Sequence, residues 1–237
     1  MTVRANTLRL GLVAAATVVG LLATSGPALA DDPTLPGLKT ALTHRIDLRL
    51  AALAKDTTVV NGAKNLTAAD KSTLTSLIGQ DTTGLTALRT KVAGQTTVDA
   101  LKADATSMVD DYRIFLLVGP KVRLAVAGDA ETVAGDRLQD AHDKLATQVA
   151  AAKAAGHDTT AAEAELSDMQ AAIDRAGKDG DGQVATLLAI QAGPDGTAIT
   201  AKVTGVRQAL SSARTDLRTA LADGKKVAAF LKSLPSS

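Results

Sequence analysis

Between Ile199 and Leu234, hydrophobic residues recur at alternating steps of four and three positions. This spacing is the a/d pattern of a left-handed coiled coil, and it predicts one long helix that needs partner helices along its length. Gly224 is the only non-apolar member of the series and is the expected weak point. The series comprises Ile199, Val203, Val206, Leu210, Ala213, Leu217, Ala220, Gly224, Val227, Leu231 and Leu234.

Helical spacing of hydrophobic residues also runs through the preceding part of the chain. The start signals Thr67–Asp70, Thr96–Asp99 and Thr160–Glu163 place a threonine cap three residues before an acid. Loops are expected at 56–65 and at Gly193–Gly196, because turn-forming residues gather there. No stretch alternates strictly enough to predict a strand. The sequence therefore predicts an all-α fold, an elongated antiparallel bundle or coiled coil of about six helices.

The most apolar stretch outside the first thirty residues is Tyr112–Val126. Residues 114–118 are apolar on every side of a helix, which is typical of a helix surrounded by other elements. We therefore expect this stretch to form the structural core of the bundle. The competing interpretation is an exposed apolar patch made for a partner. The expected core residues are Tyr112, Phe115, Leu116 and Leu117.

Gly119-Pro120 interrupts this stretch. Proline has no N–H to donate, its ring crowds the preceding turn, and it suits the first turn of a new helix. One helix is expected to end near Val118 and another to begin at Pro120, through either a kink or a hairpin. Residues 31–237 would then form one bundle, or two three-helix halves that meet near residues 119–120.

Residues 1–30 have the composition of a secretory signal peptide. Arg4 and Arg9 precede an apolar segment, Leu10–Leu22, and Ala28-Leu29-Ala30 matches a small-residue cleavage site. We expect cleavage after this site and a secreted, extracytoplasmic location. A retained membrane anchor is the alternative. A lipoprotein anchor is excluded because no cysteine follows the site.

Charge and composition argue against several classes of partner. Removing residues 1–30 leaves 24 basic against 25 acidic residues, so the chain lacks the basic excess that nucleic-acid binding requires. Tyr112, Phe115 and Phe230 are the only aromatic residues, too few to stack the bases of a single strand. No apolar segment after residue 30 is long enough to span a bilayer. Without cysteine, stability must come from packing alone.

A glycine-rich segment around Lys178–Val184 resembles the middle of an EF-hand calcium loop. Asp179 and Asp181 would occupy the third and fifth ligand positions. Gly177 and Leu188, however, stand where the loop requires an aspartate and a bidentate glutamate. Asp179 and Asp181 are the metal candidates of this segment, but we expect neither a metal nor a cofactor.

The same segment poses a structural question. Leu166, Ile173 and Leu187 lie at multiples of seven residues from one another, and Gly180 occupies the remaining position of this heptad series. This phase favours one helix with a weak middle over two helices and a loop. Elsewhere, the three histidines are far apart, and the acids near His142 are typical of a solvated helix face.

Three short segments resemble a group of uncharacterised secreted helical proteins of actinobacteria. These segments are Asn65–Lys71, Asp111–Ile114 and Pro120-Lys121, and the resemblance covers mainly Asn65–Val126. The group brings no activity, ligand or catalytic residue. The resemblance implies an exported all-α protein.

No nucleophile elbow, phosphate loop or zinc signature occurs in the sequence, so we do not expect an enzyme. The expected function is that of an exported scaffold or protein-interaction protein of the cell envelope or medium, with a protein partner or self-association through helices. The alternative is an extracytoplasmic protein that binds a small ligand or a metal. A pocket with polar residues from several helices would favour the alternative, and an outer apolar strip would favour the first expectation.

Overall fold

A computed structural model describes residues 34–235, and the predicted signal peptide with its cleavage site lies outside this part of the chain. Residues 35–235 form one compact unit. The described residues are helical and contain no strand, which confirms the predicted all-α fold. No helix among them is long and apolar enough to cross a membrane.

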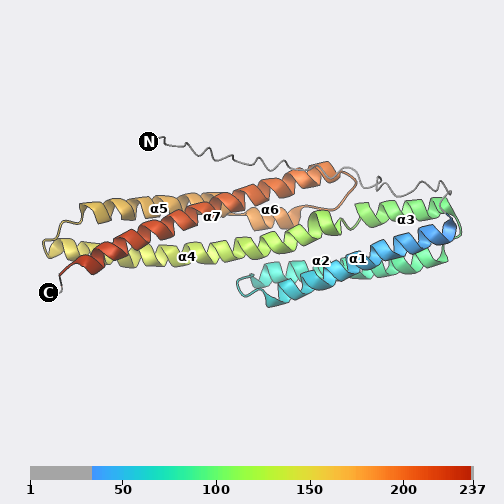
Figure 1. Cartoon of the computed structure of the whole chain (residues 1–237), viewed down its shortest axis with the longest axis horizontal. Helices are drawn as coiled ribbons and strands as arrows, with labels where there is room; N and C mark the ends of the chain where they lie inside the picture. Colours follow the sequence, from blue (N-terminus) through green and yellow to red (C-terminus); the bar gives the residue numbers. More distant parts are fainter. Residues whose placement is uncertain (1–33, 236–237) are drawn as a thin grey trace, which may run out of the picture. The chain divides into compact units, whose positions relative to one another are not determined.

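Five helices of 21 to 38 residues account for most of the packing (Figure 1). Two shorter helices and one π-helical turn connect them. In chain order the elements are α1 (Leu35–Gly62), α2 (Ala68–Gly94), α3 (Val98–Asp110), η1 (Ile114–Val118), α4 (Gly119–Ala154), α5 (Thr160–Gly180), α6 (Gln183–Ala189) and α7 (Gly196–Ser233).

Helices α1 and α2 pack antiparallel, and α3 packs against both. Asp47 of α1 pairs with Arg89 of α2 at 2.8 Å, and Lys39 donates to the carbonyl of Ala93 at 2.9 Å. The beginning of α1 therefore lies beside the end of α2. The leucine, isoleucine and valine side chains on the facing sides of these helices form a core that continues into the beginning of α4.

The predicted loop over 56–65 is wrong in its first part, because α1 continues to Gly62. The Thr57 hydroxyl donates a hydrogen bond to the carbonyl of Leu53 at 2.9 Å, so the threonine side chain does not compete with the helix. Val60 is 1 % exposed. Burial of this face outweighs the weak helix propensity of the segment.

Of the three predicted helix starts, only that at Thr67 is capped as expected. The capping box predicted at Thr160–Glu163 is wrong, because Thr159 precedes α5 and its hydroxyl donates to Glu163 Oε1 instead of accepting a backbone N–H. The Thr67 hydroxyl accepts the N–H of Asp70 at 3.1 Å, as in a capping box. The N–H of Thr67 itself donates to Asp129 Oδ2 of α4 at 2.7 Å, so a distant carboxylate takes the place of Asp70. The start predicted at Thr96 lies one residue later, with Thr97 as the cap of α3.

The predicted a/d series of α7 faces its partner helices. All of its members from Ile199 to Val227 are buried, whereas Leu231 and Leu234 are partly buried. Gly224 does not interrupt the helix. A Cβ at Gly224 would lie 3.0 Å from the sulfur of Met169, so this glycine makes room for α5 to approach.

Helix α7 runs antiparallel to α5 and parallel to α4 (Figure 1). Between α5 and α7, Arg175 pairs with Asp216 at 3.0 Å and Glu165 pairs with Lys226 at 2.9 Å, so residue numbers rise in opposite directions. Between α4 and α7 they rise together, because α4 residues 128, 135 and 145 approach α7 residues 210, 217 and 224.

The break in the central stretch lies at Arg113 and not at Gly119-Pro120. α3 ends at Asp110, Arg113 has a left-handed backbone with φ 44°, and η1 continues directly into α4. The predicted helix end near Val118 is therefore wrong. In the π-turn the Gly119 N–H reaches back five residues, and this wider turn leaves room for the proline ring.

The predicted core residues of the central stretch have different environments. Leu117 is 3 % exposed, but Phe115 is 58 % exposed and its assignment to the core is wrong. Tyr112 and Leu116 are partly buried. η1 packs against α1, α4 and α7, which leaves one side open to solvent. Phe115 lies on that open side, and the Arg49 guanidinium lies 5.3 Å from its ring centroid.

The glycine-rich segment contains a true helix break. α5 continues to Gly180, Asp181 and Gly182 form a turn, and α6 begins at Gln183. Gly182 has φ 71°, a conformation that glycine adopts without steric cost. The preference for one helix with a weak middle was therefore wrong.

Gly128 of α4 lies in tight contact with α6 and α7. A Cβ here would come within 2.5 Å of Val184 and 3.4 Å of Leu210. We expect Gly128→Ala to lower the free energy of unfolding by about 1–3 kcal/mol, because overpacking displaces neighbouring side chains. Gly135→Ala is the control, since its nearest neighbour, Leu217, lies at 3.8 Å. Urea unfolding of both variants measures the difference, and equal stability would contradict this expectation.

Candidate functional site

Helices α4 and α7 leave an apolar groove between them. The groove has a volume of about 470 Å³, and α5 contributes no residue to it. Its floor consists of alanine, valine and leucine side chains that are mostly only partly buried. The floor residues are Ala127, Ala130, Val133, Ala134 and Leu138 of α4, with Leu217 and Leu221 of α7. Leu221 is 47 % exposed, although the a/d series of the same helix is buried.

Arginine side chains stand on both sides of the groove. Arg137 belongs to α4, and Arg214 and Arg218 belong to α7. Arg214 pairs with Glu131 at 2.5 Å, whereas within residues 34–235 neither Arg137 nor Arg218 has a salt bridge. The rim therefore has an excess of positive charge.

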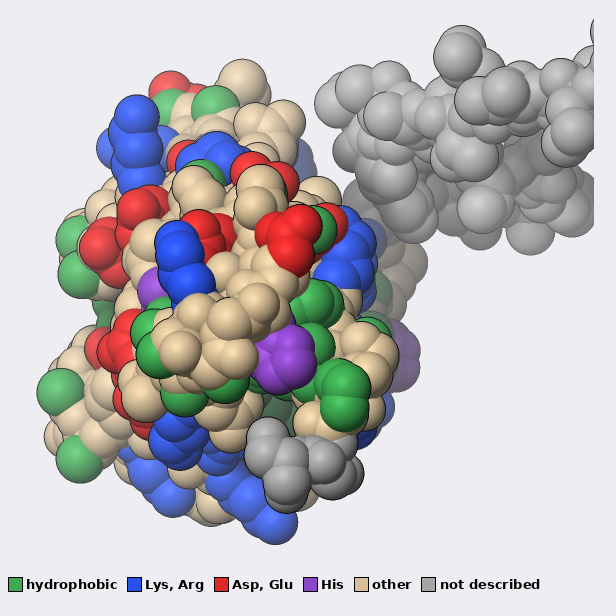
Figure 2. All heavy atoms as spheres, turned by 90° about the vertical axis from the view of Figure 1, so that its left-hand side faces the viewer, with side chains coloured by type: hydrophobic (Ala, Val, Ile, Leu, Met, Phe, Trp, Pro, Cys, Tyr) green, Lys and Arg blue, Asp and Glu red, His purple; other side chains and the backbone are tan. Residues whose placement is uncertain are grey.

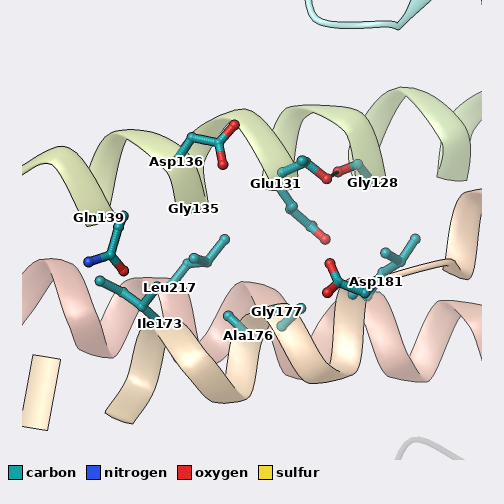
Figure 3. Close-up of a pocket in the computed structure, with 14 residues that line it drawn as sticks. Gly128, Glu131, Gly135, Asp136, Gln139, Ile173, Ala176, Gly177, Asp181 and Leu217 are labelled. Atoms are coloured by element: carbon teal, nitrogen blue, oxygen red, sulfur yellow. Dashed lines mark hydrogen bonds between the residues drawn. The ribbon is translucent and has the colours of Figure 1, made fainter. Parts of the chain in front are cut away.

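A second cavity, of about 230 Å³, lies among α4, α5 and α7. Its apolar lining comes from Ile173, Ala176, Ala213 and the two leucines Leu210 and Leu217. Its polar lining consists of Glu131, Asp136, Gln139, Thr132 and Asp181, with no basic side chain. Figure 3 shows the Glu131 and Asp181 carboxylates pointing into the space between α4 and α5. We call this cavity the acidic cleft.

Glu131 forms the wall between the groove and the acidic cleft. Its Oε1 accepts a hydrogen bond from Nε of Arg214 at 2.7 Å, and its Oε2 is buried without a hydrogen-bond partner in the described part of the chain. Burial raises the pKa of Glu131, and the Arg214 hydrogen bond and charge oppose this rise. The described residues therefore leave one acceptor in the cleft wall without a donor.

A buried ammonium holds the end of α6 against α4. Lys121 is 4 % exposed, and its Nζ donates to the carbonyls of Leu188 at 2.8 Å and Ile190 at 2.5 Å. Burial lowers the pKa of Lys121, and the negative charge of Asp81 on α2 opposes this effect. Lys121 thus connects α4 to the last carbonyls of α6, where the helix dipole favours a cation.

Arg113 fixes the neighbouring loop between α6 and α7. Its Nε donates to the Gly193 carbonyl at 2.8 Å, and its Nη2 donates to the Pro194 carbonyl at 2.7 Å. Nη2 also pairs with Asp110 at 2.7 Å. These bonds explain why Arg113 is held in an otherwise unfavourable backbone conformation. The roles of Arg113 and Lys121 are therefore structural.

Asp81 is the counterpart of Lys121 on α2. It is 9 % exposed, and its Oδ2 has no hydrogen-bond partner among the described residues. Burial raises the pKa of Asp81 to about 6, although Lys121 opposes this rise. Burial raises the pKa of Tyr112, and the negative charges of Asp111 and Asp81 add to this rise.

The raised pKa of Asp81 predicts a pH-dependent stability. Below its unfolded-state pKa this carboxyl is protonated in both states, and above about 6 it must stay ionised while buried. Its stabilising contribution is therefore present at low pH and lost as pH rises through 6. Relative to Asp81→Asn, the wild type should lose roughly 1–2 kcal/mol between about pH 4.5 and pH 7.5. Urea unfolding over this range measures the difference, and a pH-independent difference would contradict the assignment.

The two metal candidates do not come together as in a calcium loop. Asp179 lies in the last turn of α5, and Asp181 lies in the turn that follows. The twelve-residue register from Gly177 to Leu188 is mostly helical, so it does not wrap around a central point. Within the described residues, no three His, Asp or Glu side chains are grouped so that they could hold a metal ion.

Charged side chains of both signs cover the end of the bundle that carries the α4–α5 loop. Figure 2 views this end and shows acidic and basic side chains interspersed with hydrophobic ones. His142 contacts Asp143 here at 3.0 Å, and Lys153 pairs with Glu163 at 2.8 Å. Hydrophobic side chains at this end therefore lie among charges of both signs.

Comparisons with protein-family models, with curated proteins and with solved structures found no match to this chain.

Proposed function

We propose that this chain is an exported, non-enzymatic helical protein that binds a protein partner in the cell envelope or the medium. The proposal includes removal of residues 1–30 as a signal peptide, which the Arg4, Arg9 and Ala28-Leu29-Ala30 pattern supports. It also includes an elongated antiparallel coiled coil, supported by the heptad series of α7. The resemblance of Asn65–Val126 to secreted actinobacterial helical proteins is in keeping with export.

The observation that carries the proposal is the apolar groove between α4 and α7. The core series of both helices is already buried against other helices, and yet apolar side chains beside it stay partly or largely exposed, namely Ala127, Ala130 and Val133 on α4 and Leu221 on α7. Apolar residues that gather in a solvent-open groove are candidates for an interaction site. Helix-in-groove binding uses this arrangement of a hydrophobic floor and a charged rim.

Native mass spectrometry of the protein purified from its own host tests the proposal. The wild type should appear with a bound protein partner, and Leu221→Glu should remove that partner. Leu48→Glu is the matched control, because Leu48 on α1 is 50 % exposed and Leu221 is 47 % exposed. Loss of the partner in both variants, or in neither, would contradict the groove as the binding surface.

The acidic cleft favours a second candidate function, the binding of a small extracytoplasmic ligand. Polar side chains of α4 and the end of α5 face this cavity, and it contains acids but no base. A small cation is therefore the ligand class that the lining favours.

Thermal unfolding with 1,4-diaminobutane as the added ligand tests this second candidate. A ligand that binds only the native state at a hundred times its dissociation constant stabilises it by about 2.7 kcal/mol. The melting temperature should rise with added 1,4-diaminobutane in the wild type and rise less in Asp181→Asn. An unchanged melting temperature would remove this candidate.

A further inference from the structure

We infer that the partner segment of the α4–α7 groove is an acidic amphipathic helix. The inference rests on the proposed function and identifies the chemistry of the partner from the shape and the charge of the groove.

The shape of the groove fits a helix. Its two long sides are parallel helices, and its floor on the α4 side includes the small residues Ala127, Ala130 and Ala134. Small side chains let a third helix approach closely, because interaxial distances depend on the residues at the contact. From Ala127 to Leu138 the groove extends about 17 Å, which corresponds to about three helical turns of the partner.

The charge of the rim requires acidic side chains on that helix. Arg137 stands on one wall, and Arg214 and Arg218 stand one turn apart on the other. Glu131, the one acid in the lining, is already paired with Arg214. Carboxylates on both sides of an apolar stripe would match these arginines, and complementary charge of this kind supplies specificity.

The same charges argue against two other occupants. In a symmetric dimer that docks through the groove, Arg137 and Arg218 of one copy would face the arginines of the other copy. Like charges at an interface are costly. A fatty acid has a single carboxylate at one end, whereas these arginines are distributed along and across the groove. Several carboxylates spaced along a helix fit this distribution better.

The probe is a synthetic helical peptide of about 18 residues that carries a stripe of leucine and alanine flanked by glutamates. A control peptide, its twin, has lysine in place of each glutamate. Fluorescence anisotropy with the full chain should show binding of the acidic peptide about tenfold tighter than that of the twin. Arg137→Glu/Arg218→Glu should reverse this preference. The control Arg45→Glu/Lys55→Glu makes the same change of net charge on exposed positions of α1 and should leave the preference unchanged.

Circular dichroism of each variant separates lost binding from lost folding, and the reversed preference is itself evidence of a folded groove. Equal binding of both peptides by the wild type would overturn the inference, and so would an equal loss in the α1 control. If the wild type bound only a second copy of the chain, or only a fatty acid such as laurate, the inference would also be overturned. If a native partner depends on Leu221 while peptide charge has no effect, the inference fails and the proposed function stands. If the acidic peptide binds as expected but no partner co-purifies, the proposed function is the part that fails.

Discussion

Leu117→Ala is expected to lower the free energy of unfolding by roughly 2–5 kcal/mol, the range for truncating a buried leucine. Leu117 is 3 % exposed and belongs to the same buried hydrophobic cluster as Leu187 of α6 and Ile199 and Val203 of α7. Truncation would leave a cavity in this cluster. Since whole domains are stable by only about 5–15 kcal/mol, the loss should be visible as a clear fall in melting temperature.

Phe115→Ala is the matched comparison from the same helical turn. Phe115 is 58 % exposed, and its ring lies beneath the Arg49 guanidinium. Its truncation removes little buried surface and one exposed cation–π contact, so it should cost only about 0.5–1 kcal/mol. Thermal and urea unfolding of both variants compare the two positions. A larger loss for Phe115→Ala than for Leu117→Ala would contradict the orientation of η1.

Lys121→Met is expected to have a similarly large effect, roughly 3–5 kcal/mol. The substitution keeps most of the side-chain volume but removes the donor of two hydrogen bonds, to the carbonyls of Leu188 and Ile190. Hydrogen bonds from a charged donor contribute about 1.5–3 kcal/mol each, and buried carbonyls left without a partner are costly. The loss of Lys121 also leaves the Asp81 carboxylate buried without its opposing charge.

Asp81→Asn/Lys121→Met separates these two contributions. If the charge interaction matters, the double variant should be more stable than the sum of the two single changes predicts, because the isolated buried charge is gone. Hydrogen exchange of α6 should still increase in the double variant, since the anchor of its last carbonyls is missing. Unaltered stability of Lys121→Met would contradict the role assigned to this ammonium.

Hydrophobic periodicity predicted the long helices well, because burial of a continuous face determines them. The α7 series is the clearest case, with its members buried from Ile199 to Val227. Local signals were less reliable where tertiary contacts outweigh them. The polar segment at the end of α1 stays helical because Val60 is buried, and Pro120 is accommodated by a π-turn that no sequence pattern indicated.

The error at Phe115 has a related cause. A run of five apolar residues predicts burial on all sides, but the number of helices around a short turn is a property of the whole fold. η1 has neighbours on only part of its circumference, so Ile114, Leu117 and Val118 are buried and Phe115 is not. Composition alone does not distinguish the members of such a run.

The sequence contains a signal for the burial of Asp81, which is its position in the apolar series of α2. Asp81 occupies a position in the series Leu74, Ile78, Leu85 and Leu88, where steps of four and three place it on the buried face. An acid at such a position predicts a buried charge and a compensating group elsewhere. The identity of that group, Lys121, depends on how α2 meets α4 and was not accessible from spacing.

The sequence of α4 contains one indication of the groove. Either Val133 or Ala134 continues the apolar series of this helix, so its apolar face is wider than packing against one partner helix requires. The arginines on its rim gave no such signal, because exposed charges on helices are common. Their significance depends on the parallel packing of α4 and α7, which brings Arg137 and Arg218 to the two sides of one groove.

Site-specific photo-crosslinking in the host tests the central claim most directly. A photoreactive phenylalanine analogue at position 221, in the groove, is compared with the same analogue at position 48, which is equally exposed on α1. The account predicts a discrete crosslinked protein at position 221 that is absent at position 48 and diminished by Arg137→Glu/Arg218→Glu. Crosslinks at position 48 alone, or none at position 221 in cells that export the protein, would contradict the groove as the site of partner binding.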